Sequence, residues 1–466
     1  MTGLLLDDLR RFVRESDEGR LEILGAEPDW QAPLGPAVND SREASTGSLF
    51  VALSGEHTDG HRFAAAAEER GALVLLVARV PEGAGRRPVV LWQAPDPLAA
   101  LQHFATWWRC QFPGLSAIGV TGSVGKTTAK DVIAAALGSA MPVLASPRSF
   151  NNELGLPLTL LSLTAEHRAV VLEMGMYDIG DIAFLARMAR HTIGVVLNVD
   201  AVHLQRAGTI ERIAKAKQEI IDTLPPDGIA VLNGDDSRVL PMRAAAPGRT
   251  ITFGLQPGAD WRAGDVESAA DGLTLTLHRL HRTGQLRSPL RGRHHVYALL
   301  AAACVLEAMG LPFDPIVAAL AVVPAPAARQ RYLSGAGGST IIDDTYNASP
   351  LSMVAALDLL AAQGRGRTVA ILGDMLELGP ISREKHRMVG EHGARTADLV
   401  VAVGAEARDI ADAAGGVARW YADKAVMQAD VESLLRPGDT VLVKGSRGMA
   451  MEEVVAWLVA TNWFKG

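Results

Sequence analysis

The stretch Gly119-Val-Thr-Gly-Ser-Val-Gly-Lys-Thr-Thr128 decides the fold of the chain around it. It follows an apolar segment, 115–120, that is typical of a short buried strand, and it continues into a segment, 127–137, with few helix breakers. A strand, a glycine-rich loop and a helix that begins near a Lys-Thr pair are the context that a phosphate-binding loop requires. The sequence therefore predicts a site for a nucleotide phosphate chain at this point.

Each residue type in the loop has a chemical role in that prediction. Gly122 and Gly125 let backbone N–H groups approach phosphate oxygens because no Cβ intervenes. Lys126 is placed to reach the β- and γ-phosphates, and the hydroxyl of Thr127 to bind Mg²⁺. The stretch departs from the generic pattern at Val120, where a glycine is usual, and matches a shorter Thr-Gly-Ser-x-Gly-Lys-Thr form. The alternative is an ordinary glycine-rich turn with an exposed lysine.

Composition limits the kind of protein. A chain of 466 residues is too long for one core, and two to four domains are expected. Hydrophobic residues make up 48% and charged residues 21%, which is typical of a folded, soluble protein. The net charge of −7, with no cluster of Lys and Arg, argues against a nucleic-acid partner.

Cysteine usage and the N-terminus indicate the compartment. Cys110 and Cys304 lie in apolar, helical surroundings, so we expect two small buried side chains and neither a disulfide nor a zinc site. The first residues have neither a basic region nor a long apolar run, so we expect no signal peptide there. No apolar run reaches about 18 residues, which predicts no membrane span. A cytoplasmic protein is expected.

The order of apolar segments predicts an α/β fold with three domains. Residues 1–100 form a small mixed α/β domain, and residues 101–325 alternate strands with helices, which is typical of a mostly parallel sheet flanked by helices around the phosphate-binding loop. A Pro- and Ala-rich joint at 323–328 has the composition of a linker. Residues 326–466 alternate again and predict a Rossmann-like α/β domain.

Three chemically distinct groups are predicted at one edge of the central sheet. The glycine loop, Glu173 and His203 all lie at or just after the carboxyl ends of predicted strands, where α/β sheets bind ligands. Glu173 is a candidate Mg²⁺ ligand, with a solvated carboxylate as the alternative. His203 is a candidate second ligand or a structural hydrogen-bonding residue. Lys217 lies on the predicted helix 209–223, and an exposed charge is its simplest interpretation, because a protonated lysine cannot bind a metal.

A polar segment in the N-terminal domain is a candidate for binding phosphate. Ser41 and Arg42 follow Asn39 and Asp40, and a hydroxyl beside a guanidinium can contact a diphosphate. The alternative is a solvated loop.

Several motifs occur together in one order along the chain. They are Thr121-Gly-Ser-Val-Gly-Lys-Thr-Thr128, Asn151-Asn-Glu-Leu-Gly-Leu-Pro157, Glu173-Met-Gly175, His203-Leu204, Lys217, Gly292-Arg-His294, Asp343-Asp-Thr-Tyr-Asn-Ala-Ser-Pro350 and Lys444-Gly-Ser-Arg447. This order closely resembles the Mur ligases, the ATP-dependent amide-forming enzymes of bacterial peptidoglycan precursor synthesis. The resemblance spans residues from about 38 to 452. The second and seventh motifs, with Gly373-Asp-Met-Leu-Glu-Leu-Gly379, are most similar to the member that adds D-alanyl-D-alanine to UDP-N-acetylmuramoyl-tripeptide.

The resemblance implies a role for each matching position. ATP would be bound by Thr121, Gly122, Ser123, Val124, Gly125, Lys126, Thr127 and Thr128, with Asn151 and Asn152 beside the phosphates and His294, Arg329, Asp343 and Asp344 contacting adenine, ribose or phosphate. Mg²⁺ would be bound by Thr127, Glu173, His203 and Lys217, and the catalytic set would be Lys126, Glu173, His203 and Lys217. Lys217 falls where the family carries a carbamylated lysine, and a carbamate is an anion that can bind a cation. The UDP group would be received by Asp40, Ser41 and Arg42, and the dipeptide would be bordered by Tyr346, Asn347 and Ser349.

The chain departs from the family pattern at three positions. His295 and Ala298 replace two asparagines of the usual Gly-Arg-His-Asn-x-x-Asn run, which affects the contacts to adenine. Ala328 replaces a glycine before Arg329. None of these changes touches the expected phosphate or metal groups, so we expect the chemistry to be retained.

Rival hypotheses differ in acceptor or in class. A Mur ligase with another acceptor, or a folylpolyglutamate synthase, would use the same chemistry. A P-loop NTPase acting as a switch would hydrolyse ATP without a ligation product, and it would give no reason for Lys217 or for a third domain. The resemblance implies a monomer, and both diaminopimelate and lysine are compatible with the third position of the peptide.

Overall fold

The N-terminal part of the chain forms a five-stranded sheet with the order β1-β5-β4-β3-β2. The computed structural model describes residues 3–55, 58–200, 208–269, 271–324, 331–364 and 366–461. Only the pair β1 and β5 is antiparallel among the strand pairs of this sheet that the described residues form. The elements are α1 (Leu6–Ser16), β1 (Arg20–Leu24), β2 (Ala37–Val38), β3 (Leu49–Val51), α2 (Ala64–Glu69), β4 (Val74–Val77), β5 (Val89–Gln93) and α3 (Pro97–Cys110).

The middle of the chain forms a nine-stranded sheet with the order β14-β13-β12-β11-β10-β9-β6-β8-β7. Its strands are β6 (Ser116–Thr121), β7 (Val143–Ala145), β8 (Ala169–Glu173), β9 (Ile193–Val196), β10 (Ile229–Asn233), β11 (Thr250–Gly254), β12 (Trp261–Ala269), β13 (Gly272–Arg279) and β14 (Arg282–Ser288). Its helices are α4 (Lys126–Gly138), α5 (Gly155–Leu160), α6 (Asp181–Ala189), α8 (Ile210–Asp222), α9 (Val296–Ala308) and α10 (Phe313–Ala321). Helices α5, α6 and α8 contribute to the core on one face, and α4, α9 and α10 to the core on the other.

The C-terminal part forms a six-stranded sheet with the order β15-β16-β20-β17-β18-β19. Its strands are β15 (Arg331–Ser334), β16 (Thr340–Asp343), β17 (Thr368–Gly373), β18 (Leu399–Val403), β19 (Ala418–Tyr421) and β20 (Thr440–Lys444). Its helices are α11 (Pro350–Gln363), α12 (Ser382–Thr396), α13 (Arg408–Ala414), α14 (Lys424–Leu434) and α15 (Glu452–Ala460). Helices α11, α12 and α13 cover one face, and α14 and α15 contribute to the core on the other.

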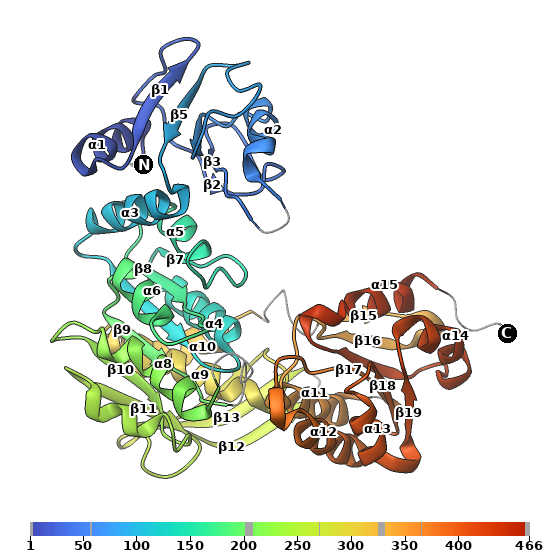
Figure 1. Ribbon diagram of the computed structural model, residues 1–466. Coiled ribbons are helices and arrows are strands. Elements are labelled where there is room, and N and C mark those ends of the chain that lie inside the picture. Colours follow the sequence, from blue (N-terminus) through green and yellow to red (C-terminus); the bar gives the residue numbers. More distant parts are fainter. Residues whose placement is uncertain are drawn as a thin grey trace.

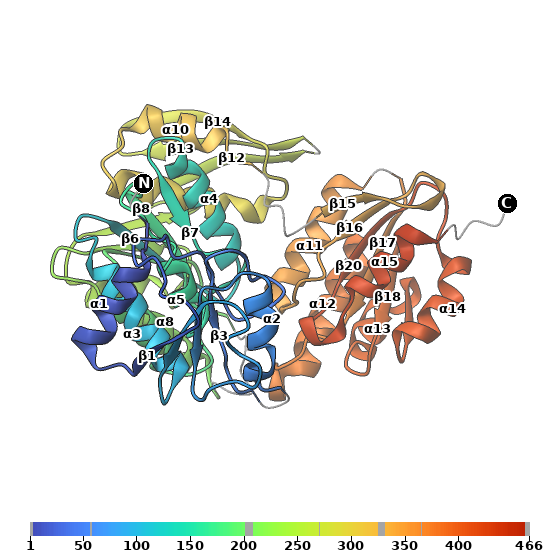
Figure 2. The same ribbon diagram turned by 90° about the horizontal axis from the view of Figure 1, so that it is seen from above.

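The three sheets form an L-shaped arrangement with the central sheet at the corner (Figures 1 and 2). The N-terminal sheet lies at one end of the central one, with α3 between them, and the C-terminal sheet lies to the side of the central one. The predicted α/β class, with a mostly parallel central sheet, is confirmed. The predicted domain boundaries at residues 100 and 325 stay predictions.

Residues 261–288 differ from the predicted alternation of strands and helices. Strands β12, β13 and β14 follow one another directly and pair antiparallel. Along β12 buried or half-buried residues alternate with more exposed ones over part of its length, which is the pattern of a strand covered on one face. Residues 261–288 show no apolar repeat of helical period, and the predicted alternation of strands with helices was wrong for this segment.

The prediction for the two cysteines was half wrong. Cys304 is buried in α9, but Cys110 is exposed. Cys110 is the last residue of α3, roughly 120° around the helix from the buried Phe104. Its sulfur accepts a hydrogen bond from Nη1 of Arg190 at 3.1 Å.

Helix α3 joins the N-terminal and central sheets through one core. Phe104 packs against Phe12 and Trp92, with ring centroids 5.0 and 5.6 Å apart. Arg109 of the same helix is 4% exposed and donates to the carbonyl oxygens of Ala189, Phe112, Leu115 and Arg190 at 2.7 to 3.3 Å. A buried guanidinium with several fixed donors ties the end of α3 to the end of α6 and to the residue before β6.

Replacing Arg109 should destabilise the protein. We expect Arg109→Met to lower the free energy of unfolding by about 2–4 kcal/mol, because it leaves buried carbonyl oxygens without donors. Urea unfolding followed by circular dichroism measures this. Arg168→Met, at an exposed arginine, is the control and should change the free energy by less than about 0.5 kcal/mol. Equal, small effects of both variants would contradict the role given to Arg109.

Candidate active site

The glycine loop lies between β6 and α4, as the sequence predicts. Gly125 precedes α4 with φ of 83°, a left-handed conformation that favours glycine. A Cβ on Gly122 would lie 3.0 Å from Cβ of Leu197, so the neighbouring chain leaves little room for a larger residue. Both glycines are therefore required by the backbone path as well as by phosphate binding.

Asn198, just after β9, holds the loop in place. Its Oδ1 accepts from N of Val124 at 2.8 Å, and its Nδ2 donates to O of Val124 at 2.9 Å. The backbone N of Ser123 donates to O of Asn198 at 3.1 Å. Sequence reasoning missed this role. The available signal was a polar side chain directly after a buried strand that pairs with β6.

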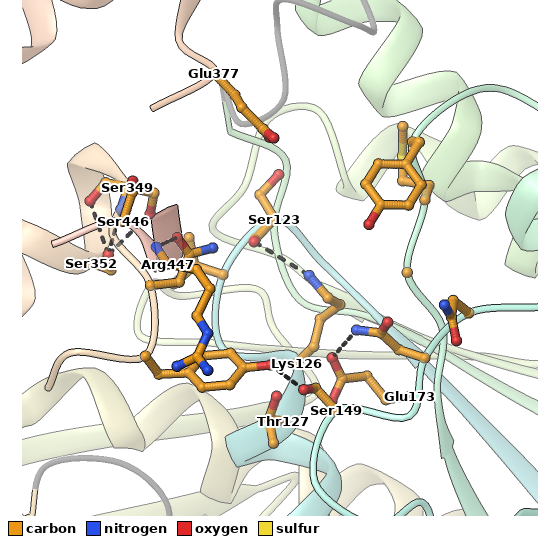
Figure 3. Close-up of a pocket in the computed structure, with 18 of the residues that line it drawn as sticks. Ser123, Lys126, Thr127, Ser149, Glu173, Ser349, Ser352, Glu377, Ser446 and Arg447 are labelled. Atoms are coloured by element: carbon orange, nitrogen blue, oxygen red, sulfur yellow. Dashed lines mark hydrogen bonds between the residues drawn. The ribbon is translucent and has the colours of Figure 1, made fainter. Parts of the chain in front are cut away.

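Lys126 and Thr127 begin α4 and line a cavity (Figure 3). Nζ of Lys126 donates to O of Gly122 at 2.9 Å, so the lysine lies back over the loop. Backbone N–H groups at a helix N-terminus attract anions, and the ammonium adds a full positive charge. This end of α4 suits a phosphate chain.

Glu173, the last residue of β8, lies beside the loop because β8 pairs with β6 in parallel. The carboxylate is 1% exposed, and its Oε1 accepts from Nδ2 of Asn151 at 2.7 Å. Its Oε2 is buried and has no hydrogen-bond partner among the described residues. A buried carboxylate oxygen without a donor is costly unless a cation or another donor binds it. Glu173 therefore fits the prediction of a Mg²⁺ ligand.

Lys217 lies on α8 and is 2% exposed, which excludes the exposed-charge interpretation. Burial lowers the pKa of this amine well below its usual range, and the charge of Lys126 lowers the pKa further. Burial and the neighbouring positive charge therefore both disfavour the charged form of this amine.

These groups share a cavity of about 510 Å³ between the central and C-terminal sheets. The central part contributes the loop, Asn151, Asn152, Glu173 and Lys217. The C-terminal part contributes Tyr346, Asn347, Ser349, Glu377, Lys444, Ser446 and Arg447. Figure 3 shows Lys126, Thr127 and Glu173 on one side and Ser349, Ser446 and Arg447 on the other.

The side of the cavity formed by the C-terminal part, here called the C-terminal wall, contains a buried ion pair. Nζ of Lys444 lies 2.6 Å from Oδ2 of Asp344 and donates to O of Asn347 at 2.8 Å. The hydroxyl groups of Tyr346 and Ser149 contact each other across the cavity, and the guanidinium of Arg447 lies 6.0 Å from the ring centroid of Tyr346. The wall is therefore connected to the central sheet through Tyr346.

A second cavity of about 600 Å³ lies on the other side of the loop. It is lined by Val124, Gly125, Thr128, His294 and Asp344, and also by Asn198, Asp235, Asp236, His295, Tyr297 and Ala298. Burial lowers the pKa of His294 well below its usual range, and the charges of His295 and Lys444 lower it further. Both departures from the family run, His295 and Ala298, thus lie at this cavity.

Other predicted site residues lie elsewhere. Thr121 is buried, donates to O of Met174 at 2.9 Å and lines neither cavity, and Asp343 accepts from Arg331 and Thr345. The segment 40–42 lies in the N-terminal sheet region, where Asp40 accepts from Arg42 and the pKa of its carboxyl falls to about 2. His203 and Arg329 lie outside the described residues.

The described residues hold no group of three or more His, Cys, Asp and Glu side chains suited to a metal ion. None of their helices combines the length and hydropathy that crossing a membrane needs. Glu173, Thr127 and Lys217 nevertheless line one cavity.

Comparisons with known proteins agree with this geometry. The chain matches the Mur ligase family, catalytic domain, over residues 38–90, the Mur ligase middle domain over 120–306 and the Mur ligase, glutamate ligase domain, over 328–447. It is 36% identical over 470 residues to the UDP-N-acetylmuramoyl-tripeptide–D-alanyl-D-alanine ligase of Synechocystis, covering 98% of each chain. This chain belongs to the Mur ligase family.

Solved structures of the Mur ligase family share the fold along nearly the whole chain. A crystal structure of MurF from Acinetobacter baumannii is 29% identical, with a TM-score of 0.85 over 99% of this chain and 100% of that one. MurF from Thermotoga maritima, solved in complex with ADP, is 29% identical, with a TM-score of 0.76 over 91% and 97%. The predicted resemblance to the Mur ligases is confirmed.

Proposed function

We propose that this protein is the ATP-dependent ligase that joins UDP-N-acetylmuramoyl-tripeptide to D-alanyl-D-alanine. The product is the UDP-linked pentapeptide precursor of peptidoglycan, and ADP and phosphate are released. The observation that carries the proposal is a cavity lined both by the phosphate-binding loop of the central part and by the segment 346–349 of the C-terminal part. Relatives about 36% identical over almost the whole chain, which bear the name of this ligase, support the choice of substrates.

The need for ATP follows from the chemistry of the acid. A carboxylate is a poor acylating agent, because attack by an amine would have to expel oxide. Transfer of the γ-phosphoryl group to the terminal carboxylate of the tripeptide gives an acyl phosphate with a good leaving group. Two anions meet in this step, so positive charge at the cavity lowers the barrier. Lys126 supplies it at the β- and γ-phosphates.

Three described residues suit a divalent cation. Thr127, Glu173 and Lys217 would bind Mg²⁺, and His203 is proposed as a further ligand. When bound, the ion neutralises charge on phosphate oxygens. The free, buried Oε2 of Glu173 is the observation that supports this assignment.

Lys217 would enter the set as a carbamate. An uncharged amine attacks CO₂, the N–C bond forms, and the nitrogen loses a proton to give an N-carboxylate. Burial lowers the pKa of Lys217 and so favours the uncharged amine that this reaction needs. Without the modification, a lysine would be a poor neighbour for both Lys126 and a cation.

The second half-reaction, attack of the dipeptide on the acyl phosphate, would involve residues of the C-terminal wall. The uncharged amine of the dipeptide attacks the acyl carbon, a tetrahedral intermediate forms, and phosphate leaves. Tyr346, Asn347 and Ser349 border the cavity and would position the dipeptide. We expect the C-terminal domain to close over the central one, which would limit hydrolysis of the acyl phosphate by water.

The positions of the matching residues suggest where the UDP group and the adenosine part of ATP bind. Asp40, Ser41 and Arg42 of the N-terminal sheet region would receive the UDP group. The second cavity, with His294 and Asp344, would hold the adenosine part of ATP, and His295 and Ala298 would replace two amide side chains there. Thr121, Asn152, Asp343 and Arg329 remain proposed contacts of the nucleotide.

The function is tested by phosphate release. The protein should release phosphate from ATP with UDP-N-acetylmuramoyl-tripeptide and D-alanyl-D-alanine together, and mass spectrometry should detect the pentapeptide. If another amine stimulates phosphate release and this dipeptide does not, the protein is a ligase with a different acceptor. Hydrolysis that is indifferent to every UDP-peptide would favour a nucleotide switch.

Lys126→Ala should abolish ligation. We expect turnover to fall by more than about 100-fold, because the ammonium at the β- and γ-phosphates is lost. Binding of the UDP-tripeptide, measured by calorimetry, should persist, since its nucleotide is assigned to another domain. Turnover close to that of the unaltered protein would remove Lys126 from the mechanism.

Lys217→Ala should lose most activity, by roughly 100-fold, and regain part of it with added formate or acetate. A small carboxylate can occupy the space of the missing carbamate. Lys215→Ala, at an exposed lysine on the same helix, should keep full activity. The proposal for Lys217 fails if its variant keeps full turnover or shows no response to either acid.

A further inference from the structure

Lys130 lies on α4, one helical turn after Lys126, and its side chain is 1% exposed. Its Nζ donates to O of Ser146 at 2.5 Å and to O of Arg148 at 2.7 Å. The ammonium also lies 3.0 Å from Oδ1 of Asp131. A buried ammonium costs folding free energy unless hydrogen bonds replace its hydration, and here two of the partners are carbonyl oxygens of one loop. The lysine therefore anchors the segment 146–151 to the helix of the phosphate-binding loop.

The anchored segment contains a strained residue. Arg148 has φ of 47°, in the left-handed region that is unfavourable for a residue with a Cβ. Nζ of Lys130 binds the carbonyl oxygen of this residue. Such a conformation persists when the surroundings fix it, and the lysine supplies that fixation.

The same segment surrounds Glu173. Backbone N of Glu173 donates to Oγ of Ser146 at 3.3 Å, and Nδ2 of Asn151 donates to Oε1 of Glu173 at 2.7 Å. Backbone N of Gly175 donates to O of Asn151 at 2.8 Å. These bonds fix one oxygen of Glu173 and leave Oε2 without a partner among the described residues. The direction of the free oxygen thus depends on where the segment lies.

We propose that Lys130 is a positioning residue for the cation site: it holds the segment 146–151 so that Asn151 orients the Glu173 carboxylate toward the end of α4. The inference rests on the proposed role of Glu173 as a Mg²⁺ ligand. Lys130 reaches neither cavity and acts only through the chain Lys130, Ser146, Asn151 and Glu173. Helix α4 thus carries Lys126 and Thr127 in its first turn, and Lys130 in its second turn positions the carboxylate of Glu173.

Manganese binding distinguishes this role from simple stabilisation. Lys130→Met keeps a long unbranched side chain but removes the three donors. We expect the dissociation constant of Mn²⁺, measured by electron paramagnetic resonance with a non-hydrolysable ATP analogue, to rise about 10- to 100-fold. Binding of UDP-N-acetylmuramoyl-tripeptide, measured by calorimetry, should change less than about twofold. Asp131→Asn, the control, removes the ion pair and keeps both carbonyl bonds, and its Mn²⁺ affinity should match that of the unaltered protein.

Two results would overturn the inference. One is a Lys130→Met protein that unfolds cooperatively on heating and has a dissociation constant for Mn²⁺ within about threefold of that of the unaltered protein. The other is an equal loss of Mn²⁺ and UDP-tripeptide binding, which would show a general structural role. Should Lys130→Met fail to fold, Lys130→Gln decides, because it removes the ammonium and keeps a polar side chain. Weaker Mn²⁺ binding of this variant with normal UDP-tripeptide binding supports the inference, and unchanged Mn²⁺ binding overturns it.

The failure of the proposed function gives a different result. If the unaltered protein binds Mn²⁺ with the ATP analogue but makes no pentapeptide, the substrate assignment fails and the role of Lys130 stands. If the unaltered protein binds no Mn²⁺ with the analogue, the cation site and the inference about Lys130 fail together, whatever the ligation assay shows.

Discussion

The parallel pairing of β6 with β8 and β9 is the constraint on which the site depends. Its register places Val120 opposite Glu173 and Thr121 opposite Val196. The glycine loop therefore begins between the carboxylate on one side and Asn198 on the other. A slip of one residue in β8 would turn Glu173 to the opposite face of the sheet. The apolar residues along these strands thus fix the distance between the phosphate-binding loop and its carboxylate.

Both walls of the first cavity are supported by a buried lysine. Lys130 lies under the segment 146–151 of the central part, and Lys444 under the segment 344–347 of the C-terminal part. Each binds backbone carbonyl oxygens, and Lys444 also pairs with Asp344. A lysine gives three donors on a flexible stem, which suits a loop with no strand partner.

Periodic apolar segments and the motif spacing predicted most of the framework and part of the site. Strands and helices alternate within residues 326–466 as predicted, and α12, β18 and β20 are examples of elements with strong periodicity and clear ends. The antiparallel β12–β14 was missed, since β12 is polar over much of its length. Asn198 and Lys130 could not be assigned from sequence: the first requires the adjacency of β9 and the loop, and the second requires a loop folded back onto α4.

The electrostatics of Lys217 connects the fold to the chemistry. The side chain of Lys217 is almost fully buried and feels the charge of Lys126. Like charges repel more strongly at a buried site than in water, so two neighbouring ammonium groups are unfavourable together. Lys126 is half-exposed on the cavity and suits the charged state. Burial and the charge of Lys126 therefore both favour the uncharged form of Lys217. The proposed carbamate would replace the repulsion between these two side chains with attraction to Lys126.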